Sequence, residues 1–163
     1  MKYGIIILVA ITFISCDYKP TNKPELEGQL LPNFNLLLVD SVTYFNTSTL
    51  KSNMPTILFY FSPNCPYSRA QMEDFVSNIQ SLRGIQFCIL TTELFNDLKT
   101  FYKDYRLNSF PNMTVGEDYT HFFQTYFKTN AVPYLAIYDV HKRLKQVLIG
   151  KSEIGTIREL VFQ

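Results

Sequence analysis

The chain has 163 residues, which is long enough for one ordinary domain with a substantial core. Apolar residues make up 47% and aromatic residues 15%, and this composition excludes disorder of the whole chain. The formal net charge is +1 and the lysines are scattered, so nucleic acid is not an expected partner.

The first residues predict a targeting segment. Lys2 gives a positive start, and residues 3–14 form an apolar run too short for a comfortable membrane span. We therefore predict a signal peptide over residues 1–15, followed by an extended tether over 16–30 in which Pro20, Pro24 and Gly28 recur. A plain secretory signal and an uncleaved anchor are the alternatives.

The residues Phe13-Ile-Ser-Cys16 resemble a bacterial lipobox. This resemblance implies cleavage before Cys16 and attachment of lipid to it, which would anchor the protein in the bacterial cell envelope, facing the periplasm or the exterior. Exported bacterial proteins meet an oxidising compartment, where disulfides form and persist.

A hairpin and a buried strand come next along the chain. Strand-forming residues at 36–39 and 42–45, separated by Asp40 and Ser41, predict an N-terminal β-hairpin. A polar connection leads to the unbroken apolar run at 56–61, which predicts a strand that is buried on both faces.

Cys65 follows that buried strand at the start of a predicted helix. The chain turns at residues 62–64, and apolar positions with helical spacing then predict a helix over 66–82. Pro66 would occupy the first helical position, where its missing N–H has no cost. The unpaired N–H groups and the positive dipole end of this helix would favour an anion, here the thiolate of Cys65.

Apolar runs and periodicity predict the remaining elements: a strand at 85–90, a helix at 94–105, a short strand at 113–115, a helix at 117–128, a closing antiparallel hairpin at 134–138 and 144–149, and a last helix at 154–161. Cys88 lies inside the strand at 85–90, where a cysteine usually behaves as a small, inert hydrophobe. A disulfide between Cys65 and Cys88 is the less favoured alternative, because one belongs to a helix start and the other to a strand interior.

The strand, the Cys-x-x-Ser sequence at 65–68, the helix and the later Val132-Pro-Tyr134 together resemble a thioredoxin fold. Within that superfamily the chain is most similar to the TlpA-like redoxin-domain thiol–disulfide oxidoreductases of bacteria, because Leu31-Pro-Asn-Phe34 matches their opening and Arg69, Ala70 and Met72 match the residues after their motif. The resemblance implies an α/β protein: a three-layer α/β/α sandwich over residues 31–163 with a mixed central sheet, an N-terminal hairpin and an insert at about 91–130.

The resemblance makes Cys65 the attacking thiol and shows that its usual partner is missing. In dithiol relatives a second cysteine three residues on releases the substrate, but this chain has Ser68 there. Ser68 could donate a hydrogen bond to the thiolate, yet it cannot break a mixed disulfide. Phe59 and Gln71 stand where relatives often carry acidic or polar groups that manage the second thiol.

Pro133 would form the other half of the site. The resemblance implies a cis bond between Val132 and Pro133, facing Cys65, with a backbone that pairs with an extended substrate. Tyr67 and Tyr134, and less strongly Tyr60, could line a groove around the thiol, although aromatic residues in this fold are more often part of the core. No His/Cys cluster has metal-ligand spacing, so neither a metal nor another cofactor is expected.

Three functions remain open from the sequence. The first is a membrane-tethered thiol–disulfide protein that acts through one cysteine on an exported protein or a small thiol. The second is a thioredoxin-like lipoprotein that binds partners without chemistry. The third is a peroxiredoxin-like peroxidase, for which Ser62 fits the signature but Leu58 replaces its proline.

Overall fold

The computed structural model describes residues 26–163. The predicted signal peptide at 1–15, the predicted lipidation site Cys16 and most of the predicted tether at 16–30 lie outside the described residues. Within the described part, no helix is both long enough and apolar enough to cross a membrane.

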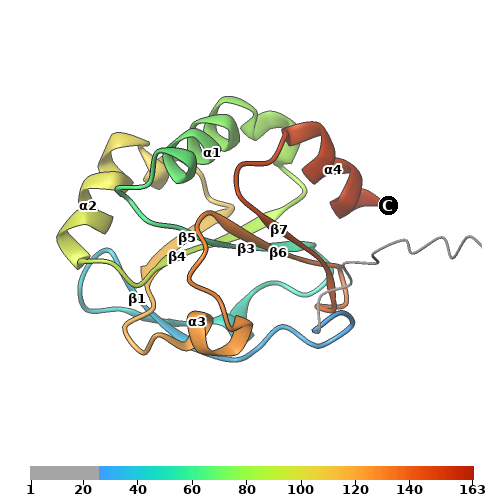
Figure 1. Cartoon of the computed structure of the whole chain (residues 1–163), viewed down its shortest axis with the longest axis horizontal. Helices are drawn as coiled ribbons and strands as arrows, with labels where there is room; N and C mark the ends of the chain where they lie inside the picture. Colours follow the sequence, from blue (N-terminus) through green and yellow to red (C-terminus); the bar gives the residue numbers. More distant parts are fainter. Residues whose placement is uncertain (1–25) are drawn as a thin grey trace, which may run out of the picture.

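The centre of the molecule is a seven-stranded mixed sheet with the strand order β2-β1-β5-β4-β3-β6-β7 (Figure 1). β3, β4 and β5 run parallel to one another, and the other neighbouring pairs are antiparallel. The strands are β1 (Asn35–Leu38), β2 (Tyr44–Asn46), β3 (Thr56–Tyr60), β4 (Gln86–Thr91), β5 (Met113–Glu117), β6 (Tyr134–Tyr138) and β7 (Leu144–Ile149).

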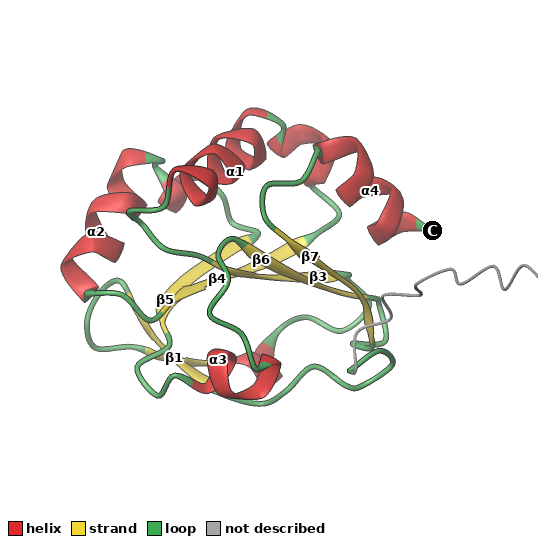
Figure 2. Cartoon of the chain, in the orientation of Figure 1, coloured by secondary structure: helices red, strands yellow, loops and turns green. Residues whose placement is uncertain are grey.

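Helices cover both faces of this sheet, which gives the three layers that the resemblance implied (Figure 2). α1, α2 and α4 lie on one face and α3 on the other (Figure 1). The helices are α1 (Pro66–Ser77), α2 (Phe95–Asp104), α3 (Phe122–Phe127) and α4 (Ile154–Phe162). The strand β5, from the region predicted as an insert, lies inside the sheet between β1 and β4.

β3 is buried along its whole length because each of its faces supplies a different core. Ile57 and Phe59 point into the core beneath α1, α2 and α4, whereas Leu58 and Tyr60 belong to the core beneath α3. This alternation is the period of two that strand geometry imposes. It explains why the sequence of β3 is a continuous apolar run rather than an alternating one.

The N-terminal hairpin closes through the predicted turn at Asp40 and Ser41. The Asp40 carboxylate accepts hydrogen bonds from the backbone N–H groups of Val42 and Thr43, at 3.0 and 2.9 Å. β1 then packs against β5 so closely that a Cβ added to Gly116 would lie 2.8 Å from the Cβ of Leu36. The attachment of the hairpin to the sheet therefore requires a glycine at this position.

Two predicted helices are shorter in the structure. α1 ends at Ser77 instead of residue 82, because the Asn78 side chain donates a hydrogen bond to the Asp74 carbonyl and a 3₁₀ turn follows. The predicted helix at 117–128 begins only at Phe122, since β5 continues to Glu117 and the buried Asp118 carboxylate accepts the N–H of Phe123 at 2.7 Å.

The folded domain also begins earlier than residue 31. The backbone N–H of Gly28 donates to the carbonyl of Leu144 at 2.8 Å, and Leu30 forms a bridge with Arg143. Residues 28–30, which the sequence placed in the tether, are thus held against the turn between β6 and β7.

Candidate functional site

Cys65 lies at the junction between β3 and α1, where the sequence placed it. It is the N-cap residue of α1, with extended backbone angles and with Pro66 in the first helical position. Its N–H donates to the carbonyl of Ser62 at 3.1 Å, and its carbonyl accepts the N–H of Arg69 at 3.0 Å. These bonds hold a tight turn that leaves the thiol partly exposed and not in a disulfide.

The proline loop faces this thiol. The peptide bond between Val132 and Pro133 is cis, as the resemblance implied. The Cys65 Sγ lies 3.9 Å from the carbonyl oxygen of Val132. Sheet register explains the proximity, because Tyr60 pairs with Tyr134, so the loop that precedes β6 meets the loop that follows β3. The N–H of Gly150 donates to the Pro133 carbonyl at 2.8 Å and supports the loop from β7.

Ser68 lies one helical turn after Cys65 but does not form the hydrogen bond proposed for it. Its side chain is fully buried, and its Oγ accepts the backbone N–H of Ser62 at 3.4 Å. No hydrogen bond between Ser68 and the Cys65 sulfur is present in residues 26–163. The hydroxyl therefore supports the turn before Cys65 instead of solvating the sulfur.

Phe59 and Gln71, the two neutral residues that the sequence singled out, both lie inside the domain. Phe59 is fully buried, with its ring 5.3 Å from that of Phe75 in an edge-to-face arrangement. Gln71 is also fully buried, and its Oε1 accepts the N–H of Ser152 at 2.7 Å. The Gln71 Nε2 has no hydrogen-bond partner among the described residues. Gln71 thus joins α1 to the segment between β7 and α4.

The aromatic residues predicted around the thiol are divided between surface and core. Tyr67 is 67% exposed in the first turn of α1, so it lies on the surface. Tyr134, in contrast, is only 6% exposed and packs against Phe123 and Phe127 of α3, so it lies in the core and not along a groove. Tyr60 is buried as well, with its hydroxyl 3.1 Å from that of Thr92.

Cys88 lies in the other core and cannot serve as a second thiol. It is fully buried in β4 beside Leu58 and Thr114, and it is not in a disulfide. Burial raises the pKa of the Cys88 thiol to about 12, with a smaller contribution from the nearby negative charge of Asp118. The expectation that Cys88 is a small buried hydrophobe is confirmed.

Sequence reasoning missed the contacts that join the Cys65 turn to α2. Asn64 and Arg69, on either side of the thiol, each reach an aspartate of α2 (Asp97 and Asp104) at 3.1 Å. The two aspartates are almost two helical turns apart, so they lie on the same face of α2. This spacing was the only signal in the sequence, and it does not by itself indicate which partners the aspartates contact.

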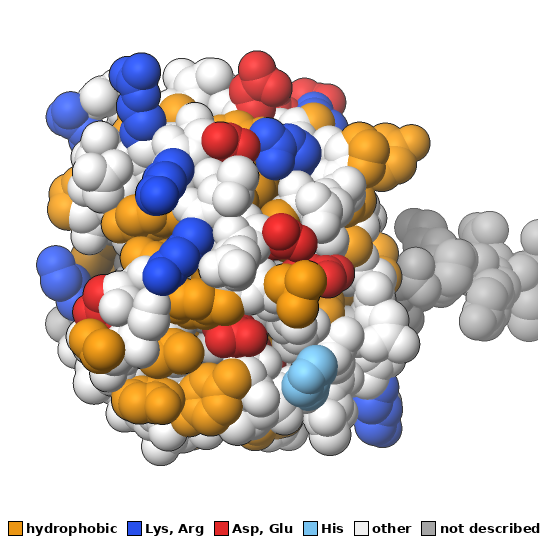
Figure 3. Space-filling model, turned by 90° about the vertical axis from the view of Figure 1, so that its left-hand side faces the viewer, with side chains coloured by type: hydrophobic (Ala, Val, Ile, Leu, Met, Phe, Trp, Pro, Cys, Tyr) orange, Lys and Arg blue, Asp and Glu red, His pale blue; other side chains and the backbone are white. Residues whose placement is uncertain are grey.

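The side of the molecule that carries α2 has no single sign of charge. Figure 3 shows acidic and basic side chains interspersed with hydrophobic ones on this side. Among residues 26–163 no group of three or more His, Cys, Asp or Glu residues could hold a metal ion. The reactive group that the geometry does place here is the free, partly exposed thiol of Cys65 next to the loop at Val132.

Comparisons with known proteins identify the fold. Neither a scan against protein-family models nor a search of curated proteins found a match. A secreted Mycobacterium tuberculosis disulfide oxidoreductase homologous to Escherichia coli DsbE superposes with a TM-score of 0.66 at 14% identity, covering 78% of this chain and 92% of that one. StoA from Bacillus subtilis superposes with a TM-score of 0.62 at 12% identity, covering 79% of this chain and 96% of that one. Peroxidoxin BcpB from Mycobacterium tuberculosis superposes with a TM-score of 0.64 at 14% identity, covering 76% of this chain and 84% of that one.

These likenesses and the strand order show that the chain has a thioredoxin-like fold. At such low identities they show the fold alone, so the activity has to be argued from this chain's own residues.

Proposed function

We propose that this chain is a thioredoxin-like thiol–disulfide protein, of the TlpA-like kind, that acts through Cys65 alone. The Cys65 thiolate attacks one sulfur of a disulfide in an exported protein or in the disulfide form of a small thiol. A new disulfide forms between Cys65 and that sulfur, and the other sulfur leaves as a thiolate, which then takes up a proton.

One observation carries this proposal: a partly exposed thiol at a helix N-terminus lies 3.9 Å from the carbonyl that precedes a cis-proline. The Val132 carbonyl belongs to the loop that precedes β6, and it lies beside the thiol. An extended peptide could pair with this loop, as in strand addition, while its disulfide reaches Cys65.

The second half of the reaction needs a thiol from outside the chain. Ser68 occupies the position of a resolving cysteine, and Cys88 lies buried in the opposite core. A thiol from solution attacks the substrate sulfur of the mixed disulfide, takes that sulfur into a new disulfide and regenerates the Cys65 thiolate. The mixed disulfide should therefore persist until such a thiol is supplied.

We propose in addition that the protein works at the bacterial cell envelope, attached through lipid on Cys16. The support is the lipobox-like Phe13-Ile-Ser-Cys16 sequence after an apolar run that starts with Lys2. Metabolic labelling with a palmitate analogue tests this, and label that remains in a Cys16→Ala variant would contradict the anchor.

The experiment for the thiol function uses a peptide whose single cysteine is linked to thionitrobenzoate, a coloured leaving group. The full chain with Cys16→Ser should release one equivalent of thionitrobenzoate and retain the peptide on Cys65, as judged by intact mass. A Cys65→Ser variant should release none. Loss of the peptide before an external thiol is added would contradict the single-cysteine mechanism.

The same variant separates this proposal from a binding module. If cells that carry Cys65→Ser keep the phenotype of the wild-type gene, the thiol is dispensable and the chain binds without chemistry. A peroxidase has weaker support, because Leu58 stands where the peroxiredoxin signature has proline, and it is fully buried in β3. Consumption of peroxide by the wild-type chain, but not by Cys65→Ser, would favour that alternative.

A further inference from the structure

α2 holds the Cys65 turn from both sides of the thiol. The Nδ2 of Asn64, directly before Cys65, donates to the Oδ2 of Asp97 at 3.1 Å. The Nη2 of Arg69, in the first turn of α1, lies 3.1 Å from the Oδ2 of Asp104. We call these two interactions the α2 contacts.

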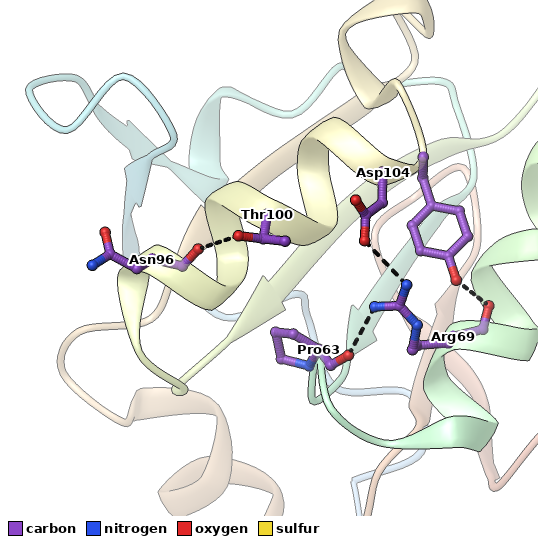
Figure 4. Close-up of polar contacts among 6 residues, drawn as sticks. Pro63, Arg69, Asn96, Thr100 and Asp104 are labelled. Carbon is purple, nitrogen blue, oxygen red and sulfur yellow. Dashed lines mark hydrogen bonds and ion pairs between the residues drawn. The ribbon is translucent and has the colours of Figure 1, made fainter.

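Arg69 also binds the turn itself. Its Nη1 donates to the Pro63 carbonyl at 3.3 Å, so a single guanidinium connects the turn to the carboxylate of Asp104 (Figure 4). The same guanidinium lies 5.8 Å from the ring centre of Phe101 and 5.4 Å from that of Tyr105. The planar fork of arginine suits this combination of two hydrogen bonds and ring stacking.

Tyr105 completes the arrangement from the end of α2. Its hydroxyl donates to the backbone carbonyl of Arg69 at 3.2 Å. Arg69 is thus fixed through both its side chain and its backbone by the last turn of α2. Because the carbonyl of Cys65 accepts the N–H of Arg69, this fixed residue is also bonded to the backbone of the thiol residue.

We propose that the α2 contacts position the Cys65 turn so that its sulfur faces the Val132 carbonyl, and that they thereby favour peptide disulfides over small disulfides. This inference rests on the proposed function. A peptide must align its backbone with the loop at Val132 while its sulfur meets Cys65, so it needs both parts of the site in a fixed relation. A small disulfide has no backbone to align and needs only an accessible sulfur.

Loosening the turn should therefore affect the two classes of substrate differently. The peptide reaction should slow because the sulfur and the loop lose their fixed relation. The reaction of a small disulfide should stay the same or become faster, because a more mobile turn exposes the sulfur more often. A contact that served only stability would change both rates in the same direction.

The test compares two probes that share one leaving group. The first is a short alanine- and serine-rich peptide with a central cysteine linked to thionitrobenzoate, and the second is the hydroxyethyl thionitrobenzoate disulfide. In both cases Cys65 attacks the sulfur that belongs to the peptide or to the hydroxyethyl group, and thionitrobenzoate leaves. The absorbance of the released thionitrobenzoate therefore gives both rates. The protein is the full chain with Cys16→Ser, and Cys88 is silent because it is fully buried.

Arg69→Met keeps the apolar stem over the aromatic rings and removes the guanidinium. We expect the ratio of the peptide rate to the hydroxyethyl rate to fall by up to about fivefold, the upper end of the change expected for the loss of one half-exposed ion pair. Asp104→Asn should lower the ratio in the same direction, and the double variant should fall no further than the lower of the two single variants. Arg69→Lys, which retains the charge, should recover part of the ratio.

Arg143→Met is the matched control. Arg143 lies in the turn between β6 and β7, and its side chain donates a hydrogen bond to the Gly28 carbonyl at 3.0 Å. That turn lies beyond the Thr56 end of β3, whereas Cys65 lies beyond the Tyr60 end, because Thr56 pairs with Tyr138. The control should lose a comparable surface interaction without a change in the ratio.

Each outcome decides between the two proposals. A ratio that stays at the wild-type value in Arg69→Met, Asp104→Asn and Arg69→Lys, or two rates that fall together, would overturn the positioning role of the α2 contacts. If the wild-type chain releases thionitrobenzoate from neither probe, the proposed thiol function itself fails. Should Arg69→Met not fold, as seen by circular dichroism, Asp104→Asn and Arg69→Lys carry the comparison.

Discussion

Replacing Ser68 with cysteine should give this chain the resolving step that it lacks. Ser68 is one turn after Cys65 on α1, and helix geometry places Cα atoms three residues apart at roughly 5 Å. This separation falls within the about 4.4–6.8 Å that disulfides span. The introduced thiol can therefore attack the mixed disulfide on Cys65, release the substrate as a thiol and leave an intramolecular disulfide.

The size of the effect follows from the placement of the two thiols. A tethered thiol acts at an effective concentration on the order of millimolar or above. The Ser68→Cys variant should therefore release the bound peptide with no added thiol, whereas the wild type should need about millimolar external thiol for a similar rate. The stability cost should be small, because the Ser68 hydroxyl accepts one long hydrogen bond of 3.4 Å, worth at most about 1.5 kcal/mol.

The assay follows the peptide adduct by intact mass after one turnover with the thionitrobenzoate peptide. Ser68→Cys should lose the adduct with time and gain an internal disulfide, while the wild type and a Ser68→Ala control should keep the adduct. The reasoning would be refuted if both thiols of Ser68→Cys react with iodoacetamide and the adduct still lasts as long as in the wild type.

Three further predictions concern the two cores. In the folded chain with Cys16→Ser, iodoacetamide should modify Cys65 alone, because burial covers Cys88 completely and raises its pKa to about 12; a second adduct on the folded protein, by mass spectrometry, would contradict this. Phe59→Ala should lower the free energy of unfolding by about 3–5 kcal/mol in urea titrations, and a loss below about 1 kcal/mol would argue against the tight packing of this fully buried ring. Burial raises the pKa of Tyr134 from 10.0 to about 12, so the unfolded chain ionises first and stability should fall as the pH rises through this interval. The stability of the Tyr134→Phe variant should fall less steeply with pH than that of the wild type. Equal slopes in the two proteins would refute the raised pKa of Tyr134.

Much of the fold could be predicted because its strongest patterns are local. The continuous apolar run that became β3 must be buried on both faces, which already requires a layer on each side of the sheet. The boundaries that failed depend on single side chains that make non-periodic contacts. Asn78 ends α1 with a hydrogen bond to a carbonyl, and the buried Asp118 delays α3 until Phe122. The spacing of apolar residues in the sequence gives no information about such polar contacts.

The two parts of the candidate site that sequence motifs mark, the thiol and the proline loop, could be predicted. Cys65 at a strand–helix junction and the loop at Pro133 could be located by resemblance, and the structure brings them together. The roles of neighbouring side chains could not be located in this way. Tyr134 turned into the core because the period of β6 places it on the α3 face, and the partner of Arg69 lies on a helix that is distant in sequence.

The close approach of β1 at Gly116 also limits how this chain can vary. A single methyl group there would collide with Leu36 and with the backbone carbonyl of Leu37, both part of the hairpin. Gly155, in contrast, has open space around it in the first turn of α4, and alanine there should gain less than the about 1 kcal/mol that it gains in a helix interior. A saturation mutagenesis library should therefore tolerate many residues at Gly155 and retain glycine at Gly116, where the accessory hairpin is joined to the rest of the sheet.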